Sequence, residues 1–422
     1  MSPRLGKRHS EEASVLVVTL LIASLVGITI GSYLIMVSGQ NRSVVRSQAW
    51  NSALAISEAG VEEALAQLNP GAPEPVIDRT ANGWGAAVNG LYGPRNSALS
   101  NGTYAVVYTD DKYPIIYSTG YVTVPAISAT LTRVLRVGTT NVPLFNAAMA
   151  ARNGINLNGN GIATDSFNSS DPNLSTNGRY DPTKTSTNGT VASFTGIVNV
   201  GNADVNGAVL LGPVATDSIS KNGIVTGGVR NDFNFEFEDV VLPSALSNAP
   251  IAQANPQTIN GTNYQYVFTS SGDYQLSSLN GSVYVASNAN VRLYLSGNSN
   301  PSAIEVGASG TNSGSLAIYM AGASFSVAST VVDGGKAANL SYYGLPSNTS
   351  VTMGGNASFT GTIYAPEADF KLGGGGSSTY NFVGACVVNT VTMTGHFNFH
   401  YDEAITLTGP VRGYVACSWQ EI

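Results

Sequence analysis

The side chains that could carry acid–base or metal chemistry are few and widely spaced in this sequence. Charged residues make up 11% of the 422 positions, and the chain has only 3 histidines. His396 and His400 stand close to Asp402 and Glu403, which suggests a metal site. On a strand that rises about 3.3 Å per residue, however, the two histidines would be about 13 Å apart, too far to share one ion. We therefore expect structural histidines and no metal site.

The carboxylates of the second half are also dispersed. The aspartates that could serve a catalytic groove fall on separate segments: Asp165, Asp171, Asp181, Asp204, Asp217 and Asp333. The run Gly373–Gly376 lacks the Lys-Ser/Thr pair of a phosphate-binding loop. We predict neither a catalytic nor a cofactor site, and hence a protein that is not an enzyme. The alternative is a secreted or tethered β-helix enzyme that acts on polysaccharide.

Calcium is the one ion that the sequence leaves open. An Asn/Asp-rich stretch brings together Asn168, Asp171 and Asp181, and calcium prefers carboxylate and amide oxygens of this kind. These three residues are the candidate ligands.

The two cysteines, Cys386 and Cys417, both lie near the end of the chain in apolar, strand-like segments. A disulfide between them would close a loop of about 30 residues and stabilise the fold by roughly 3–4 kcal/mol. An even number of cysteines in an exported protein favours this bridge. Two buried free thiols are the alternative.

Overall composition argues against a nucleic-acid-binding protein. The net charge is −7, the isoelectric point is near 5.0, and the 19 Lys and Arg residues form no basic stripe that could neutralise phosphates. The surface must instead be covered largely by Asn, Ser, Thr and the 47 glycines. This composition is typical of an extracellular β-rich protein.

An uncharged apolar segment near the start of the chain is long enough to cross a membrane. No charged residue occurs between Ala13 and Asn41, whereas a bilayer core of about 30 Å needs only roughly 20 apolar residues. We assign residues 14–38 as the membrane anchor and residues 1–13, with Arg4, Lys7 and Arg8, as a basic leader on the cytoplasmic side. A cleaved signal peptide is less favoured because its apolar region would span about 7–15 residues.

The helical pattern continues beyond the anchor to about residue 69, where Asn69-Pro70-Gly71 stops it. A helix from Ser10 to Leu68 would be roughly 90 Å long. Within the anchor, Ala23, Gly27 and Gly31 are spaced four apart, so they share one face on which a second helix could pack closely.

The distal part of this helix resembles a known family. Residues 56–68 read Ile-Ser-Glu-Ala-Gly-Val-Glu-Glu-Ala-Leu-Ala-Gln-Leu, and Glu58, Ala59, Gly60, Ala64 and Leu68 match the helix motif of PilX-type minor pilins. The resemblance implies a type IV pilin-like protein. It departs from major pilins, because no Gly-Phe or Gly-Met junction precedes the anchor and no glutamate stands early in it. The resemblance therefore implies a minor or tip subunit.

After the helix the sequence changes to strand patterns. Residues 102–109, 113–124 and 129–137 alternate β-branched or aromatic residues with polar ones, which predicts a small antiparallel sheet within a unit at 70–140. From 141 to 422, short strands separated by Gly and Asn predict an irregular β-helix without a fixed repeat. The expected fold class is α+β, mainly β. Residues 239–405 also resemble an uncharacterised family often joined to PilX-type N-termini, through the segments at 356–370 and 395–404.

These observations together predict a single-pass membrane protein whose bulk is exported to the periplasm or the cell surface. The function expected from the resemblance is that of a minor pilin-like subunit of a type IV pilus or related secretion filament, with the β-helix used for assembly priming, adhesion or surface interaction. The implied partners are other pilin-like subunits and the inner-membrane assembly machinery. A surface or glycan ligand is not identified by the sequence.

Overall fold

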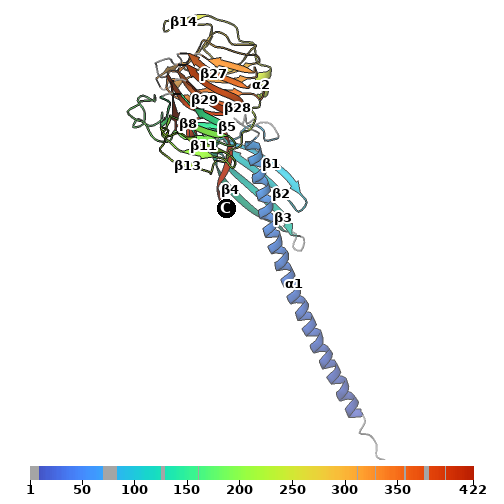
Figure 1. Ribbon diagram of the computed structural model, residues 1–422. Coiled ribbons are helices and arrows are strands. Elements are labelled where there is room, and N and C mark those ends of the chain that lie inside the picture. Colours follow the sequence, from blue (N-terminus) through green and yellow to red (C-terminus); the bar gives the residue numbers. More distant parts are fainter. Residues whose placement is uncertain are drawn as a thin grey trace, which may run out of the picture. The chain divides into compact units, whose positions relative to one another are not determined.

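The computed structural model describes residues 9–69, 83–124, 129–159, 161–310, 312–327, 329–355, 358–374, 380–394 and 396–422. The basic leader residues Arg4, Lys7 and Arg8 lie outside this part, as do Asn356, Ala357, Gly375 and Gly376 of the motifs above. The chain forms two compact units (Figure 1). Unit 1 contains the described residues of Met1–Gln67, Asp78–Thr140 and Val415–Ile422, and unit 2 is built on Asn141–Tyr414.

Helix α1 (His9–Leu68) is one uninterrupted helix of 60 residues. Its first half is exposed almost throughout from Val15 to Gln48, including the side chains of Leu20 and Ile35. Among the described residues it is the one helix long and apolar enough to cross a membrane. A single N-terminal apolar helix is compatible with a single-pass anchor.

Unit 1 pairs the second half of α1 with a five-stranded sheet. The strand order is β1 (Leu91–Leu99), β2 (Gly102–Thr109), β3 (Ile115–Val124), β4 (Ala129–Pro143) and β31 (Val411–Glu421). Strands β1 to β4 are antiparallel. The small antiparallel sheet is thus confirmed, with two more strands than the sequence pattern predicted.

Both unpredicted strands have a physical explanation. In β1 the register shifts between Tyr92 and Arg95, and Pro94 interrupts the alternation of apolar and polar residues on which a strand prediction relies. Strand β31 comes from the far end of the chain. The sequence assigns residues 415–422 to the exported β-domain at 141–422, whereas the structure places Val415–Ile422 in unit 1.

Helix α1 approaches the sheet closely because two glycines face the contact. A Cβ on Gly60 would lie 2.3 Å from the Ser118 Oγ atom, and a Cβ on Gly120 would lie 2.2 Å from the Ala53 carbonyl oxygen. Around these positions Ile56, Val61 and other apolar side chains of α1 are fully buried. The core of unit 1 therefore depends on backbone proximity that only glycine allows.

Unit 2 is a stack of parallel strands arranged in three columns. The first column contains, in order of pairing, β17 (Gly272–Leu276), β19 (Asn290–Leu295), β23 (Ser315–Met320), β26 (Leu340–Gly344), β28 (Phe359–Gly374), β29 (Tyr380–Met393), β5 (Met149–Leu157), β7 (Val191–Ser193), β10 (Val209–Leu211) and β13 (Val229–Arg230).

The other two columns share long strands with the first: the second column includes parts of β28 and β29, and the third includes parts of β28, β29 and β5. The second column adds β16 (Tyr266–Phe268), β18 (Ser282–Val285), β20 (Ala303–Val306), β25 (Thr330–Val332), β30 (Phe397–Asp402), β6 (Ala163–Phe167), β9 (Asp204–Val205) and β12 (Ile224–Val225). The third adds β24 (Ser324–Val327), β27 (Ser350–Gly355), β8 (Ile197–Gly201) and β11 (Thr216–Ile219).

Short elements decorate the coils of the stack. They are the hairpins β14 (Gln257–Ile259) with β15 (Thr262–Tyr264) and β21 (Ala308–Ser309) with β22 (Asn312–Ser313), and the helical turns α2 (Ser244–Ser247), η1 (Ala337–Asn339) and α3 (Ile405–Thr408). Together these elements confirm the expected fold class, a long N-terminal apolar helix with a small antiparallel sheet and a large β-body.

The order of strands in the stack is a circular permutation of their order in the chain. Strand β29, near the end of the chain, pairs with β5, near the start of unit 2, so that Cys386 lies beside Met149. Figure 1 shows the red strands β28 and β29 next to the green strands β5 and β8. From β5 the chain winds outward to β13, crosses to the opposite end of the stack, and winds back from β17 to β29.

The two ends of the stack differ. At the β17 end, the Gln275 amide N–H donates to the Pro250 carbonyl at 3.0 Å, and the Asn255 side chain bonds both the Val267 N–H and the Val267 carbonyl at 2.8 Å. At the other end, β11 and β12 pair on one side only within the part of the chain that the structure describes. Ile224 of β12 is 52% exposed there.

We expect Gly60→Ala to destabilise unit 1, because the added methyl group would have to displace Ser118 and Tyr104. Overpacking of this kind costs about 1–3 kcal/mol. Thermal unfolding of the full chain in detergent, followed by near-UV circular dichroism, measures the effect. The matched control is Gly39→Ala, whose Cβ meets nothing within 4 Å. Equal melting temperatures for the two variants would contradict the close approach.

We expect Asn255→Ala to destabilise unit 2 by about 1–3 kcal/mol, since it leaves two backbone groups of Val267 unpaired at the capped end. Asn222→Ala, an exposed turn position between β11 and β12, is the control. Chemical denaturation should separate the two variants, and indistinguishable midpoints would show that the Asn255 side chain does not cap the stack.

Candidate functional site

One face of α1 carries the small residues expected to pack against another helix. Ala23, Gly27 and Gly31 lie in the exposed half of α1, and a Cβ on either glycine would meet nothing within 4 Å. The face is open in the single chain. The proposed helix contact at these residues remains a prediction.

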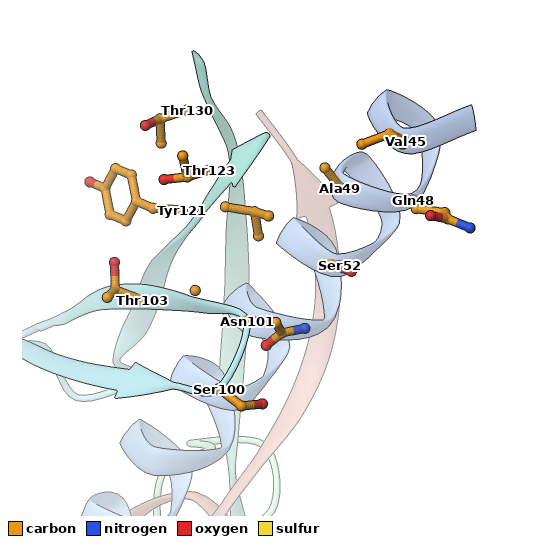
Figure 2. A pocket seen from close by; sticks show the side chains of 12 residues that line it. Val45, Gln48, Ala49, Ser52, Ser100, Asn101, Thr103, Tyr121, Thr123 and Thr130 are labelled. Carbon is orange, nitrogen blue, oxygen red and sulfur yellow. The ribbon is translucent and has the colours of Figure 1, made fainter. Parts of the chain in front are cut away.

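A groove of about 860 Å³ lies between α1 and the sheet of unit 1 (Figure 2). Figure 2 shows Val45 and Ala49 on the helix side and Tyr121 and Thr123 on the sheet side. None of its 12 lining residues is charged. Ala49 follows Gly31 by 18 residues, which is five helical turns, so the groove opens on the same face of α1 as Gly31.

The pilin-like motif places Gly60 at the contact between α1 and the sheet, beside Ser118 and Tyr104. Gly60, Ala64 and Leu68 are buried, Ala59 is half-buried and Glu58 is exposed. The motif itself therefore describes a packing surface.

An acid outside the motif also holds the helix on the sheet. The Glu63 carboxylate accepts a hydrogen bond from Arg95 Nε at 3.0 Å and another from the Tyr104 hydroxyl. Burial, and then the adjacent Glu63 carboxylate, raise the pKa of Tyr104. Sequence reasoning did not single out Glu63, because its partners come from strands that only the fold brings near it.

In unit 2, His400 belongs to a buried polar cluster. Its Nδ1 lies 2.5 Å from Asp165 Oδ1 and its Nε2 lies 3.1 Å from Asn381 Oδ1. The Tyr180 ring stacks on the imidazole with centroids 3.6 Å apart, and its hydroxyl donates to Asp165 Oδ2 at 2.8 Å. Burial and the Asp165 carboxylate raise the Tyr180 pKa. The cluster joins β6, β29 and β30 to the loop after β6.

The other two acids of the suspected metal site do not point at His400. Asp402 accepts hydrogen bonds from the Ser169 and Ala404 amides, and burial raises the pKa of Asp402. Glu403 accepts from Ser166 Oγ at 2.7 Å and from the Asn188 amide at 2.8 Å. Each carboxylate therefore serves a different turn.

Side-chain oxygens of the Asn/Asp-rich stretch accept hydrogen bonds from the backbone and side chains of the same loop. Asn168 and Asp171 each accept a hydrogen bond from the amide two residues ahead. Hydrogen bonds from Thr176 and Thr183 lower the pKa of Asp181 to about 2. The oxygens considered as calcium ligands thus stabilise the turns of this loop.

The ammonium group of Lys184 occupies the same loop, donating to the Pro172 and Ser175 carbonyls at 2.9 and 2.8 Å. Calcium is coordinated by backbone carbonyl oxygens as well as by carboxylates. In this loop they bind a side-chain cation of the chain itself.

The expected disulfide is not formed. Cys386 is a fully buried thiol on β29 in unit 2, where burial raises its pKa. Cys417 is an exposed thiol on β31 in unit 1, and its Sγ donates to the Gly138 carbonyl at 3.3 Å. The prediction failed because two apolar strand-like segments near the end of the chain belong to different units.

We expect a maleimide reagent to label one cysteine per native chain, Cys417, and two after denaturation, because the buried Cys386 thiol is neutral and inaccessible. Peptide mapping by mass spectrometry identifies the labelled residue. Cys417→Ser should abolish native labelling. If neither cysteine is labelled until the protein is reduced, the two residues form a disulfide and the expectation of free thiols is wrong.

A family model described as a domain of unknown function matches residues 248–408, which lie within unit 2. No curated protein matches the chain. A solved structure, the competence-associated pilin ComZ from Thermus thermophilus, aligns with 11% identity over 89% of this chain and 97% of that one, at a TM-score of 0.31. A score this low does not establish a shared fold.

Proposed function

We propose that this protein is a PilX-type minor pilin-like subunit of a type IV pilus or related secretion filament, anchored by α1 and displaying unit 2. The observation that carries the proposal is the division of one helix into two halves. The first half is apolar and exposed, and the second half packs on an antiparallel sheet at Gly60, with Ala64 also buried.

The proposed orientation places the N-terminus in the cytoplasm and both units outside it. Arg4, Lys7 and Arg8 precede the anchor, and cytoplasmic flanks of membrane helices are enriched in basic residues. Export also fits the low content of charged residues. The bulk of the chain would then lie in the periplasm or at the cell surface.

Other pilin-like subunits and the inner-membrane assembly machinery are the proposed partners. The face of α1 with Ala23, Gly27 and Gly31 lets a second helix approach closely in lipid, where small residues drive association. The uncharged groove next to Ala49 continues that face outside the membrane. A neighbouring helix could therefore follow α1 along most of its length.

The proposed role of unit 2 is non-enzymatic: surface interaction, adhesion or priming of assembly. Acids that could have served catalysis are committed to the fold. Asp165 is bound by His400 and Tyr180, and Asp181 by the threonines of its own loop. The Asp165 and His400 side chains are only 14% and 3% exposed, so this acid–base pair is enclosed in the fold and does not face a groove that a polymer could enter.

We expect replacement of Gly27 and Gly31 by Leu to leave membrane insertion and folding intact but to reduce incorporation into filaments. The added side chains meet open space in the single chain, yet they would separate packed helices. Immunoblots of sheared filament fractions and of membranes measure incorporation and insertion.

Gly39→Leu is the matched control, because Gly39 is also an open helical glycine and lies on a different face. Equal incorporation of wild type and the double variant would reject the helix-packing role. Absence of the wild-type chain from filament fractions, despite its presence in membranes, would reject the filament function itself.

A further inference from the structure

A segment without regular structure crosses the side of unit 2 between its two ends. We call residues 231–241, which follow β13, the strap. The Phe233 amide donates to the Leu211 carbonyl at 3.1 Å, and the Glu238 carbonyl accepts from the Tyr364 hydroxyl at 2.8 Å. The strap therefore passes from β10, near the open end, to β28, nearer the capped end.

The strap alternates aromatic and polar residues. Phe233 and Phe235 are buried against the stack, and the Phe237 ring lies 4.9 Å from that of Phe235. Between them, Asn234 is exposed and the Glu236 side chain is 75% exposed. One edge of the strap is consequently a row of rings, and the other presents an amide and a carboxylate.

A groove of about 570 Å³ lies between the strap and the adjacent corners of two coils. Its lining residues are Arg152, Asn153, Phe194, Thr195, Asn234, Phe235, Glu236 and Phe237. The rings of Phe194 and Phe237 are 6.1 Å apart and only partly buried. This size and this mixture of apolar surface with a few polar groups are typical of small-ligand sites.

A hydrogen-bonded ladder of polar side chains extends from the groove along the stack. Thr195 donates to Asn153 Oδ1 at 2.8 Å, Asn153 donates to Asn389 Oδ1 at 2.7 Å, and Asn389 donates to an Asp369 oxygen at 2.9 Å. Neighbouring strands lie about 4.8 Å apart, so the ladder offers polar groups at regular steps.

The charges of the groove disfavour an anionic ligand. The Arg152 guanidinium is paired with Glu367, and that of Arg412 with Glu236 and Glu238 at 2.6 and 2.9 Å. Three carboxylates therefore face two guanidinium groups. No excess positive charge is available here for a phosphate or a sulfated chain.

From this arrangement we propose that the groove binds a neutral saccharide. A sugar ring has an apolar C–H face that can lie on the ring of Phe194 or of Phe237, which are tilted by 53° to each other, and hydroxyl groups that both donate and accept. The Asn234 amide and the Glu236 carboxylate offer the matching donors and acceptors. The ligand would be what the displayed unit 2 recognises, so the inference rests on the proposed function.

The test is calorimetric titration of the full-length protein in a detergent without a sugar headgroup. The probes are short neutral cello-, malto- and chito-oligosaccharides. We expect saturable binding of one series, weakened about tenfold by Asn234→Ala or Glu236→Ala, since each removes a side chain that would hydrogen-bond the sugar. Both positions are exposed, so the fold should persist, and Glu238 still pairs with Arg412.

Asn222→Ala, at an exposed turn of the same stack, is the control and should bind as wild type does. The inference is overturned if none of the probes binds, if the two groove variants bind normally, or if an extended peptide binds there in place of saccharides. Filament incorporation reports separately on the proposed function. Asn234→Ala should leave incorporation unchanged, and replacement of Gly27 and Gly31 by Leu should leave saccharide binding unchanged.

Discussion

The parallel pairing of β29 with β5 is the interaction on which unit 2 depends. It joins the half of the stack that begins at β17 to the half that begins at β5, through two runs of paired residues from Cys386 to Met393, and β30 pairs with β6 beside it. Without it, each half would have an uncovered strand edge in the middle of the molecule. Because the chain enters at β5 and returns at β29, this contact has the greatest sequence separation among the described strand pairings of unit 2, so the stack closes only when nearly all of unit 2 has been synthesised.

The same permutation explains what could be predicted from the sequence. Local patterns located β2 at its observed bounds and most of β3 and β4, because apolar and polar residues alternate there and turn residues separate the strands. Helix α1 was also predictable from local sequence, since an apolar run followed by helical spacing of apolar residues continues without interruption to Asn69. The general class of unit 2 followed from its short strands and its many Gly and Asn residues.

Contacts between distant segments could not be predicted in this way. Val291 lies beside Leu316 and Leu316 beside Leu340, steps of 25 and 24 residues, whereas Met149 and Val191 are 42 residues apart because the Asn/Asp-rich loop is inserted between their strands. No fixed repeat remains to be detected. The predicted disulfide was wrong for a related reason. Nothing in the local sequence shows that the chain leaves unit 2 after Tyr414.

The strap is a further consequence of the permuted order. A stack wound continuously from one end to the other needs no return segment, whereas this one must carry the chain back past several coils. A returning segment covers apolar surface best when alternate side chains face the stack, and Phe233, Phe235 and Phe237 follow that rule. The intervening Asn234 and Glu236 must then face outward, beside the corners of the coils. The groove therefore arises from the way the chain closes its stack, and its polar rim can vary in sequence without disturbing the core.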